Sequence, residues 1–296
     1  MGTFVTIDVV DDGRATERTL AEREDAVARA FSWFRTLEAT CTRFDPNSEL
    51  MQLAAAAGRP VSVSPLLFEA VRFALEVASD TDGAFDPTVG RTMESRGFNR
   101  EHRTGETVQS PIGAGDQPVT FRDVEIDERT HSITLHQPLI LDLGAVVKGL
   151  GVDMAARELA PLRNFAIYAG GDLYLSGTNA RREPWAIGIR HPRDEAAIFE
   201  AVRVSDAAVC TSGDYERRSP ADGGAHIVDP RDGRPASRAA SVTVIAPTAI
   251  VADALATAAF VLGPEDGLRL LARQGVEGLI VTPDLARHAT GGFGRV

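Results

Sequence analysis

The sequence predicts a single α+β domain, and three observations support this prediction. The chain has 296 residues, which is enough for one large hydrophobic core. Segments with strand and helix patterns are interspersed without the regular strand–helix–strand period of a doubly wound sheet. No internal repeat or linker is visible. We therefore expect residues 1–296 to form one large domain with mixed and antiparallel sheets and packed helices.

The first half of the chain predicts one strand and two long helices. Residues 4–10 alternate between apolar and polar side chains, as a half-buried strand does. Residues 16–39 carry apolar side chains at helical spacing. Pro65 begins a second helix that runs to about residue 77, at a position where helices tolerate proline. The shorter elements are a turn at 44–50 that leads into a short helix ending near Gly58, and strands near 124–127 and 132–136.

The second half is richer in strand patterns and contains one strongly apolar helix. Thr248 is a favourable N-cap for this helix, which ends near Leu262 with Gly263 as its C-cap. The polar residues 211–215 are expected to interrupt the preceding strand. The strands are expected at 165–169, 173–177, 185–189, 199–204, 207–210, 226–228, 241–245 and 279–281.

Composition and charge exclude several classes of function. The net charge of −11 disfavours nucleic acid and anionic membranes as partners. No apolar run approaches the roughly 18 residues of a membrane-spanning helix. The start of the sequence lacks the basic and apolar regions of a signal peptide, so we expect a cytoplasmic protein. Cys41 and Cys210 form no metal-binding pair, and no histidine cluster indicates zinc, so both thiols are expected to be buried and free.

Residues 139–153 combine features of an anion-binding turn. An apolar run ends in Asp142, glycines follow at 144, 149 and 151, and a helical pattern begins at Val152. Glycines allow close backbone approach, a helix start favours an anion, and Lys148 adds positive charge. The spacing matches neither a Walker loop nor a dinucleotide-binding fingerprint. Two interpretations stay open here: a seat for a phosphorylated ligand, or an ordinary strand-to-helix connection.

The apolar helix near 248–262 contains a candidate metal site. Asp253 and Thr257 are four residues apart and therefore lie on one helical face. A carboxylate and a hydroxyl form a reasonable partial shell for Mg²⁺, which completes its coordination with phosphate and water. The alternative is that Asp253 caps a backbone group or faces solvent, while Thr257 bonds back to a carbonyl.

Eight motifs occur in an order that resembles one known family. They include Ala-Gly-Gly-Asp at 169–172 and a His-x-x-Asp-Pro sequence that begins at His226. Together the motifs resemble the ApbE-type FAD:protein FMN transferases over nearly the whole chain. The full set occupies residues 1–3, 44–50, 83–90, 141–149, 169–172, 211–215, 226–233 and 252–258.

The resemblance implies an ApbE-like domain with an FAD cleft between lobes and a Mg²⁺ ion at the FAD diphosphate. Enzymes of this kind transfer the FMN half of FAD onto a Ser or Thr hydroxyl of a target protein and release AMP. Mg²⁺ would be bound by the side chains of Asp253 and Thr257 and by the carbonyl of Ala145. His226 would be the base or orienting group for the incoming hydroxyl. The implied FAD contacts are Met1, Phe44, Ala84, Phe85, Asp86, Asp142, Lys148 and Ile227.

The chain also departs from the family pattern. Tyr168 stands where Asn is common, and Ala145-Val146-Val147 replaces a common Gly-Ile-Ala. Family members are usually exported and often lipid-anchored, so an exported, membrane-anchored protein is the alternative to the cytoplasmic one if a leader lies outside this sequence. Two other activities stay open: an FAD pyrophosphatase that yields FMN and AMP, and a non-catalytic FAD-binding protein. An acceptor protein with an Asp-Gly-x-Ser/Thr motif would favour the transferase.

Overall fold

A seven-stranded antiparallel sheet is the centre of the molecule. The computed structural model describes residues 2–10, 17–102, 104–112, 118–221 and 223–294. The N-terminal strand β1 pairs with β5 from the middle of the chain, so the sheet joins distant parts of the sequence. In spatial order the strands are β1 (Val5–Val9), β5 (Phe165–Ala169), β6 (Asp172–Ser176), β9 (Ala207–Gly213), β10 (Ser241–Ala246), β11 (Glu277–Val281) and β12 (Arg287–Ala289).

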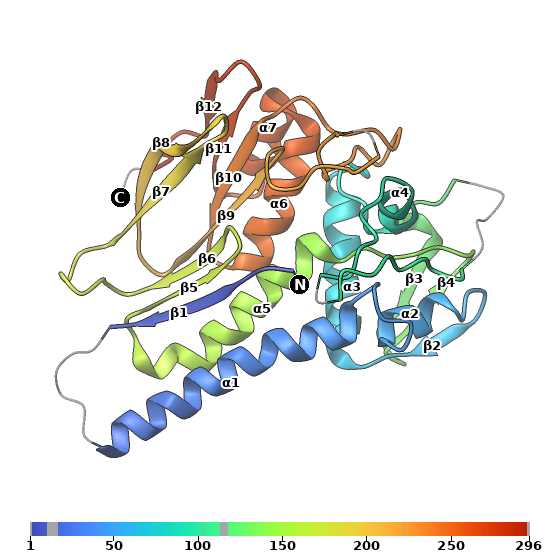
Figure 1. The fold of residues 1–296 in the computed structure, drawn as a ribbon, viewed down its shortest axis with the longest axis horizontal. Coiled ribbons are helices and arrows are strands. Elements are labelled where there is room, and N and C mark those ends of the chain that lie inside the picture. The colour runs from blue at the N-terminus through green and yellow to red at the C-terminus, as the bar shows by residue number, and fades with distance from the viewer. Residues whose placement is uncertain (1, 11–16, 103, 113–117, 222, 295–296) are drawn as a thin grey trace.

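Helices cover one face of this sheet. Helix α5 (Gly144–Leu159) contacts β5 and β6, and α6 (Ala249–Leu262) contacts β9 and β10. The long helix α1 (Glu17–Cys41) packs against α5, which lies between α1 and the sheet (Figure 1). Helix α7 (Pro264–Arg273) packs on α6 and β11.

A smaller group of elements lies beside this layer, on the right in Figure 1. Its helix α3 (Pro65–Asp80) contacts α1, α5 and α6 and thereby joins the two parts. The remaining members are α2 (Glu49–Ala54), α4 (Gly90–Ser95), the short 3-10 helix Pro87–Val89 and a three-stranded sheet of β2 (Pro60–Ser62), β4 (Ser132–Leu135) and β3 (Val124–Asp127).

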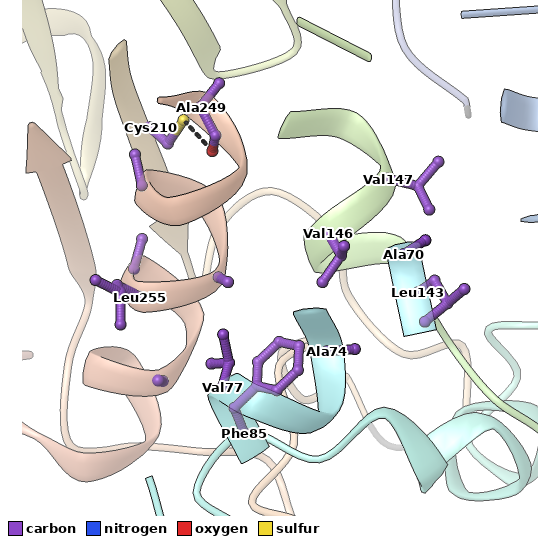
Figure 2. Close-up of a cluster of buried hydrophobic side chains, with 14 of the residues drawn as sticks. Ala70, Ala74, Val77, Phe85, Leu143, Val146, Val147, Cys210, Ala249 and Leu255 are labelled. Carbon is purple, nitrogen blue, oxygen red and sulfur yellow. Dashed lines mark hydrogen bonds between the residues drawn. The ribbon is translucent and has the colours of Figure 1, made fainter. Parts of the chain in front are cut away.

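The opposite face of the large sheet is covered by the hairpin of β7 (Trp185–His191) and β8 (Asp194–Val204). Side chains alternate between the faces of a strand, so each face has its own core. Phe165 and Ile167 of β5 face the helices, whereas Ala166 belongs to the smaller core under the hairpin. Figure 2 shows the larger core where α3, the start of α5 and α6 meet.

These findings confirm the predicted α+β class with antiparallel sheets and packed helices. Both cysteines are free and buried, as predicted. None of the helices in the described residues combines the length and apolarity needed to cross a membrane.

The prediction for residues 139–153 was wrong in its local structure. Residues 139–143 form no strand, and α5 already begins at Gly144. The later glycines therefore lie inside a helix and serve its packing. A Cβ atom on Gly149 would lie 2.5 Å from the carbonyl oxygen of Ala249, and one on Gly151 would lie 2.9 Å from the Phe34 ring. Close contact with α6 and α1 explains both glycines.

Two other local predictions were also wrong. Residues 211–213 continue strand β9 because they pair with β10 through Gly213 and Ser241. Residues 226–228 form no strand, and Val228 makes only an isolated bridge to Pro235. Residues 211–213 are a strand because β10, which is distant in sequence, pairs with them. Residues 226–228 are not a strand because no neighbouring strand pairs with them among the described residues. Pairing therefore decides strand formation more strongly than the local sequence pattern does.

Candidate active site

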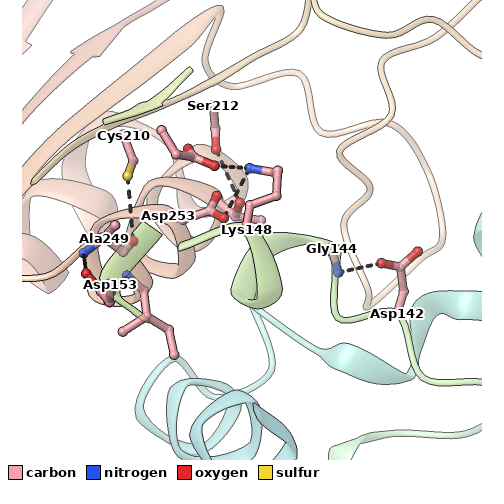
Figure 3. A network of polar contacts seen from close by, with 11 residues as sticks. Asp142, Gly144, Lys148, Asp153, Cys210, Ser212, Ala249 and Asp253 are labelled. Carbon is pink, nitrogen blue, oxygen red and sulfur yellow. Dashed lines mark hydrogen bonds and ion pairs between the residues drawn. The ribbon is translucent and has the colours of Figure 1, made fainter. Parts of the chain in front are cut away.

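Lys148 stands at the centre of a buried ionic cluster (Figure 3). Its Nζ atom forms ion pairs with Asp172 and, at 3.1 Å, with Oδ2 of Asp253. The Asp172 and Asp253 side chains are 1% and 5% exposed, and Lys148 is 24% exposed. One ammonium group therefore faces two buried carboxylates, and the cluster has an excess negative charge when both are ionised.

The pKa values in this cluster reflect that imbalance. Burial lowers the pKa of Lys148, but the Asp172 and Asp253 charges outweigh burial and hold this pKa above its usual range. Burial and the Asp253 charge raise the pKa of Asp172 despite the contact with Lys148. Lys148 is therefore charged at neutral pH, while the carboxylate pair would gain from a further cation.

Oxygen atoms surround this cluster and suit a hard cation. Thr257 lies one helical turn after Asp253, and its Oγ1 atom is 3.2 Å from the hydroxyl of Ser212 on β9. Ala145, in the first turn of α5, has φ −92° and ψ 15°, outside helical geometry. Within the described part of the chain, no three His, Cys, Asp or Glu side chains form a metal cage. Mg²⁺ does not need one, since it takes one or two carboxylates plus phosphate oxygens and water, so these residues fit it.

A second polar pair lies just before α5. Asp142 accepts hydrogen bonds from the Gly144 backbone at 2.9 Å and from Nε of Arg43 at 2.8 Å. Burial raises the pKa of Asp142, but the Arg43 charge and the Gly144 bond outweigh burial and lower it overall. Arg43 is 6% exposed, donates to the Phe98 carbonyl, and lies 4.3 Å over the Phe44 ring. Its Nη1 atom has no hydrogen-bond partner among the described residues.

His226 lies near the Arg43–Asp142 pair, because its ring contacts Phe98, whose carbonyl accepts a hydrogen bond from Arg43. Burial, followed by the Arg217 and Lys148 charges, lowers the pKa of His226 to about 4. Its ring meets Phe98 edge-on with the centroids 6.4 Å apart. The Nδ1 atom is buried and has no hydrogen-bond partner in the described structure. The imidazole is therefore neutral near pH 7 and able to accept a proton.

The side chains of the predicted FAD contacts at 84–86 all have partners within the protein. Ala84 and Phe85 are buried in the large core, and Phe85 lies against Val77 in Figure 2. Asp86 directs one oxygen to the backbone and hydroxyl of Thr88 and the other to the backbone of Phe121. Its carboxylate thus orders the turn.

This turn is connected to the start of α5. The Asp142 N–H donates to the Pro87 carbonyl at 2.7 Å. Ile227 is buried next to His226 in the large core. Met1 lies outside the described residues. The structure therefore brings together Lys148, Asp253 and Thr257 directly, and leaves the contact of Ala84, Phe85 and Ile227 with FAD as a prediction.

A comparison with known families now decides the classification. A sequence model of the ApbE family matches residues 1–280. The chain belongs to the ApbE family.

Individual members of the ApbE family are similar over most of this chain. The FAD:protein FMN transferase of Rhodobacter capsulatus is 32% identical, covering 91% of this chain, which spans only 53% of that relative's length. The enzyme of the same name from Haemophilus influenzae is 30% identical, and the alignment covers 91% of this chain and 81% of that relative. The solved flavin transferase ApbE from Vibrio cholerae has a TM-score of 0.80 at 28% identity and covers 99% of this chain and 95% of its own.

Sequence reasoning missed two polar residues of this ApbE-family site and one helix cap close to it. Asp172 ends the Ala-Gly-Gly-Asp motif, so its position was visible, but its contact with Lys148 was not. Arg43 directly precedes the predicted Phe44, and a lone arginine in a turn gave no signal of burial. Asp153 accepts from the backbone N–H groups of Ala249 and Ile250 at 2.7 and 2.9 Å. It caps α6, whereas the predicted cap, the Thr248 side chain, makes no capping bond.

Proposed function

We propose that the protein transfers FMN from FAD to a Ser or Thr hydroxyl of a target protein in a Mg²⁺-dependent reaction and releases AMP. The observation that supports this proposal best is the ionic cluster of Lys148, Asp172 and Asp253 beside a neutral His226. The similarity to relatives named FAD:protein FMN transferase points to the same reaction. We further propose that residues 1–296 act as one catalytic unit.

The reaction requires a new phosphoester bond and the loss of AMP. The acceptor oxygen attacks the phosphorus on the FMN side of the diphosphate, and the bond from this phosphorus to the bridging oxygen breaks. AMP leaves with that oxygen. Such a transfer depends mainly on alignment and on neutralisation of charge. When bound, Mg²⁺ would neutralise charge on the diphosphate.

The chain's own residues have distinct roles in this reaction. Asp253, Thr257 and the Ala145 carbonyl would hold Mg²⁺, and Lys148 would direct its positive charge toward the diphosphate. His226 would take the proton of the acceptor hydroxyl, which a neutral imidazole can do near pH 7. Its low pKa keeps this base neutral well below pH 7.

The predicted FAD contacts divide into two groups in this proposal. Phe44 and Asp142 form the first group: both contact the buried Arg43, which holds these two proposed FAD contacts in place. The turn at 84–86 is tied to Asp142 through Pro87 and would contact FAD through its backbone or after a small shift. Met1 and Ile227 remain proposed contacts on the same basis.

The test is incubation with FAD and Mg²⁺, with and without a protein that carries an Asp-Gly-x-Thr acceptor motif. We expect flavin fluorescence on the acceptor in a denaturing gel, together with AMP release, and loss of both in His226→Ala. His136→Ala is a matched control because His136 is half exposed and pairs with Glu125 at the surface. AMP and free FMN without labelled acceptor would indicate a hydrolase. Intact bound FAD would indicate a binding protein.

A further inference from the structure

The sheet face opposite α5 and α6 contains a groove outside the ionic cluster. Its volume is about 540 Å³. One wall is formed by Tyr168, the β5–β6 turn at Gly170 and Gly171, and Thr211 on β9. The other wall is formed by five consecutive residues of β7, 186–190. Because side chains alternate along a strand, a wall of consecutive residues means that the edge of β7 faces the groove.

This edge of β7 is free to pair with another strand. In the described structure β7 pairs with β8 alone, in a two-stranded sheet. No backbone hydrogen bond connects residues 186–190 to the chain outside this hairpin among the described residues. Unpaired N–H and C=O groups along a strand edge are a template for an added strand.

An exposed aromatic side chain lies beside the groove. Val5 pairs with Ala169, and the Thr3 side chain lies against Gly170, so Phe4 between them is adjacent to this end of the groove. Phe4 is 93% exposed, the most exposed large hydrophobic side chain among the described residues. Tyr168 lines the groove from the neighbouring strand. An apolar side chain of a partner would have an aromatic surface to bind here.

The other end of the groove carries both basic and acidic side chains, including Glu216. A second cavity of about 220 Å³ shares Arg190 and Tyr215 with it and is also lined by Arg193, Glu195 and Arg218. Arg190 and Arg193 form ion pairs with acidic residues. Arg218 donates to the Gly223 carbonyl at 3.2 Å and has no ion pair within the described residues. Arg218 is therefore the cation at this end that can pair with an acidic group of the partner.

The groove and the ionic cluster lie on the two faces of the same strand end. Gly171 lines the groove, and the next residue, Asp172, holds Lys148 on the helix side. Any polypeptide in the groove therefore passes within one residue of the cluster's own strand. Gly170 and Gly171 carry no side chain and have φ of +61° and +99°, and the Thr3 side chain lies against Gly170.

We propose that this groove binds the acceptor polypeptide as an extended strand paired with the free edge of β7. An acidic residue of the acceptor lies toward Arg218, and an apolar residue lies on Phe4. The hydroxyl that receives FMN passes the Gly170–Gly171 turn. This inference rests on the proposed transferase function, because it names the docking site of that reaction's protein substrate.

The first test measures binding independently of the chemistry. The probe is a fluorescein-labelled 15-residue peptide that contains Asp-Gly-Ala-Thr-Ser-Ala-Thr, and its affinity for the intact protein with FAD is read by fluorescence anisotropy. Two further peptides carry N-methyl groups on alternate residues, in the two opposite phases. We expect one phase to weaken binding roughly tenfold and the other to bind normally, since only one set of N–H groups faces β7. Equal binding by both phases, or no binding by any peptide, would overturn the proposal.

The second test uses surface variants. Phe4→Ala and Arg218→Ala should each raise the Kd of the peptide several-fold without changing AMP release from FAD in the absence of peptide. Leu20→Ala is the matched control, because Leu20 is another exposed large hydrophobic residue and lies on α1. Unchanged peptide affinity in both groove variants would refute this docking site.

The two proposals can fail separately. Labelling of the peptide that is insensitive to N-methylation and to the groove variants would retain the transferase and reject the groove. Phase-sensitive binding without any labelling would retain the groove as a peptide site and reject the transferase. If the groove instead joins two copies of this chain, sedimentation would show a dimer that Phe4→Ala dissociates, and the peptide proposal would be wrong.

Discussion

Helix α6 involves two buried carboxylates, one that caps it from α5 and one within it, and their negative charges are stabilised in different ways. Asp153, on α5, directs both oxygens to the first two backbone N–H groups of α6. Asp253, in the second turn of α6, depends on the ammonium group of Lys148, which it shares with Asp172. These N–H groups have no partner within the helix, so the loss of Asp153 would leave them unsatisfied, whereas a lysine side chain can move to another partner. The first arrangement is therefore structural, and the second leaves a carboxylate able to exchange its partner for a ligand.

The largest expected effect follows from Asp253→Asn. We predict a loss of Mg²⁺-dependent AMP release of roughly 10³-fold, because a key carboxylate for the cation is removed. The free energy of unfolding should change by only about 1 kcal/mol, since Lys148 keeps its pair with Asp172. AMP release and urea denaturation measure the two effects. Asp266→Asn, at an exposed ion pair on α7, is the control. Turnover within twofold of wild type would remove Asp253 from the site.

Asp153→Ala should show the reverse pattern. It leaves the N–H groups of Ala249 and Ile250 without their acceptors and should lower the free energy of unfolding by about 2 kcal/mol. AMP release per folded molecule should stay near the wild-type value. Urea denaturation and turnover at a temperature where the variant is folded provide the comparison. A stable but inactive variant would show that Asp153 belongs to the catalytic group instead.

The smallest expected effect is the pH dependence of this loss. Burial raises the pKa of Asp153 in the folded protein to about 6, whereas the ordinary pKa of an aspartate in the unfolded chain is 3.8. Between about pH 4 and 6 the folded state therefore binds a proton that the unfolded state does not, and wild-type stability falls as pH rises through this window. Asp153→Ala lacks this proton, so its deficit should be larger at pH 4 than at pH 7. A deficit that grows with pH instead would contradict the raised pKa.

Much of the fold could be read from local pattern. The helix of 249–262, its Gly263 end and the strand at 165–169 were predicted at or close to their observed bounds. Strong periodicity and a glycine at positive φ are local signals, so no tertiary information was needed. The prediction of a strand at 139–143 was wrong because the sequence shows an apolar run but does not show that the run lacks a neighbouring strand to pair with.

The candidate site was only partly predictable. Asp253 and Thr257 could be found because a carboxylate in an apolar helix is costly to bury unless it binds a cation or accepts hydrogen bonds. Asp172 and Arg43 could not, since their importance comes from partners 24 and 99 residues away. The helix cap was misassigned for the same reason: the Thr248 side chain is adjacent in sequence, but Asp153 reaches α6 from another helix.

The sequence by itself determined the α+β class, the ApbE family and the residue types available for metal and phosphate chemistry, because these depend on composition, periodicity and ordered motifs. Only the tertiary structure decided how each charged group is satisfied. It placed one lysine between two carboxylates, capped α6 with Asp153 and left the edge of β7 unpaired. Pairings of this kind form across the packed layers, where burial makes an unsatisfied group costly and the fold alone selects the partner.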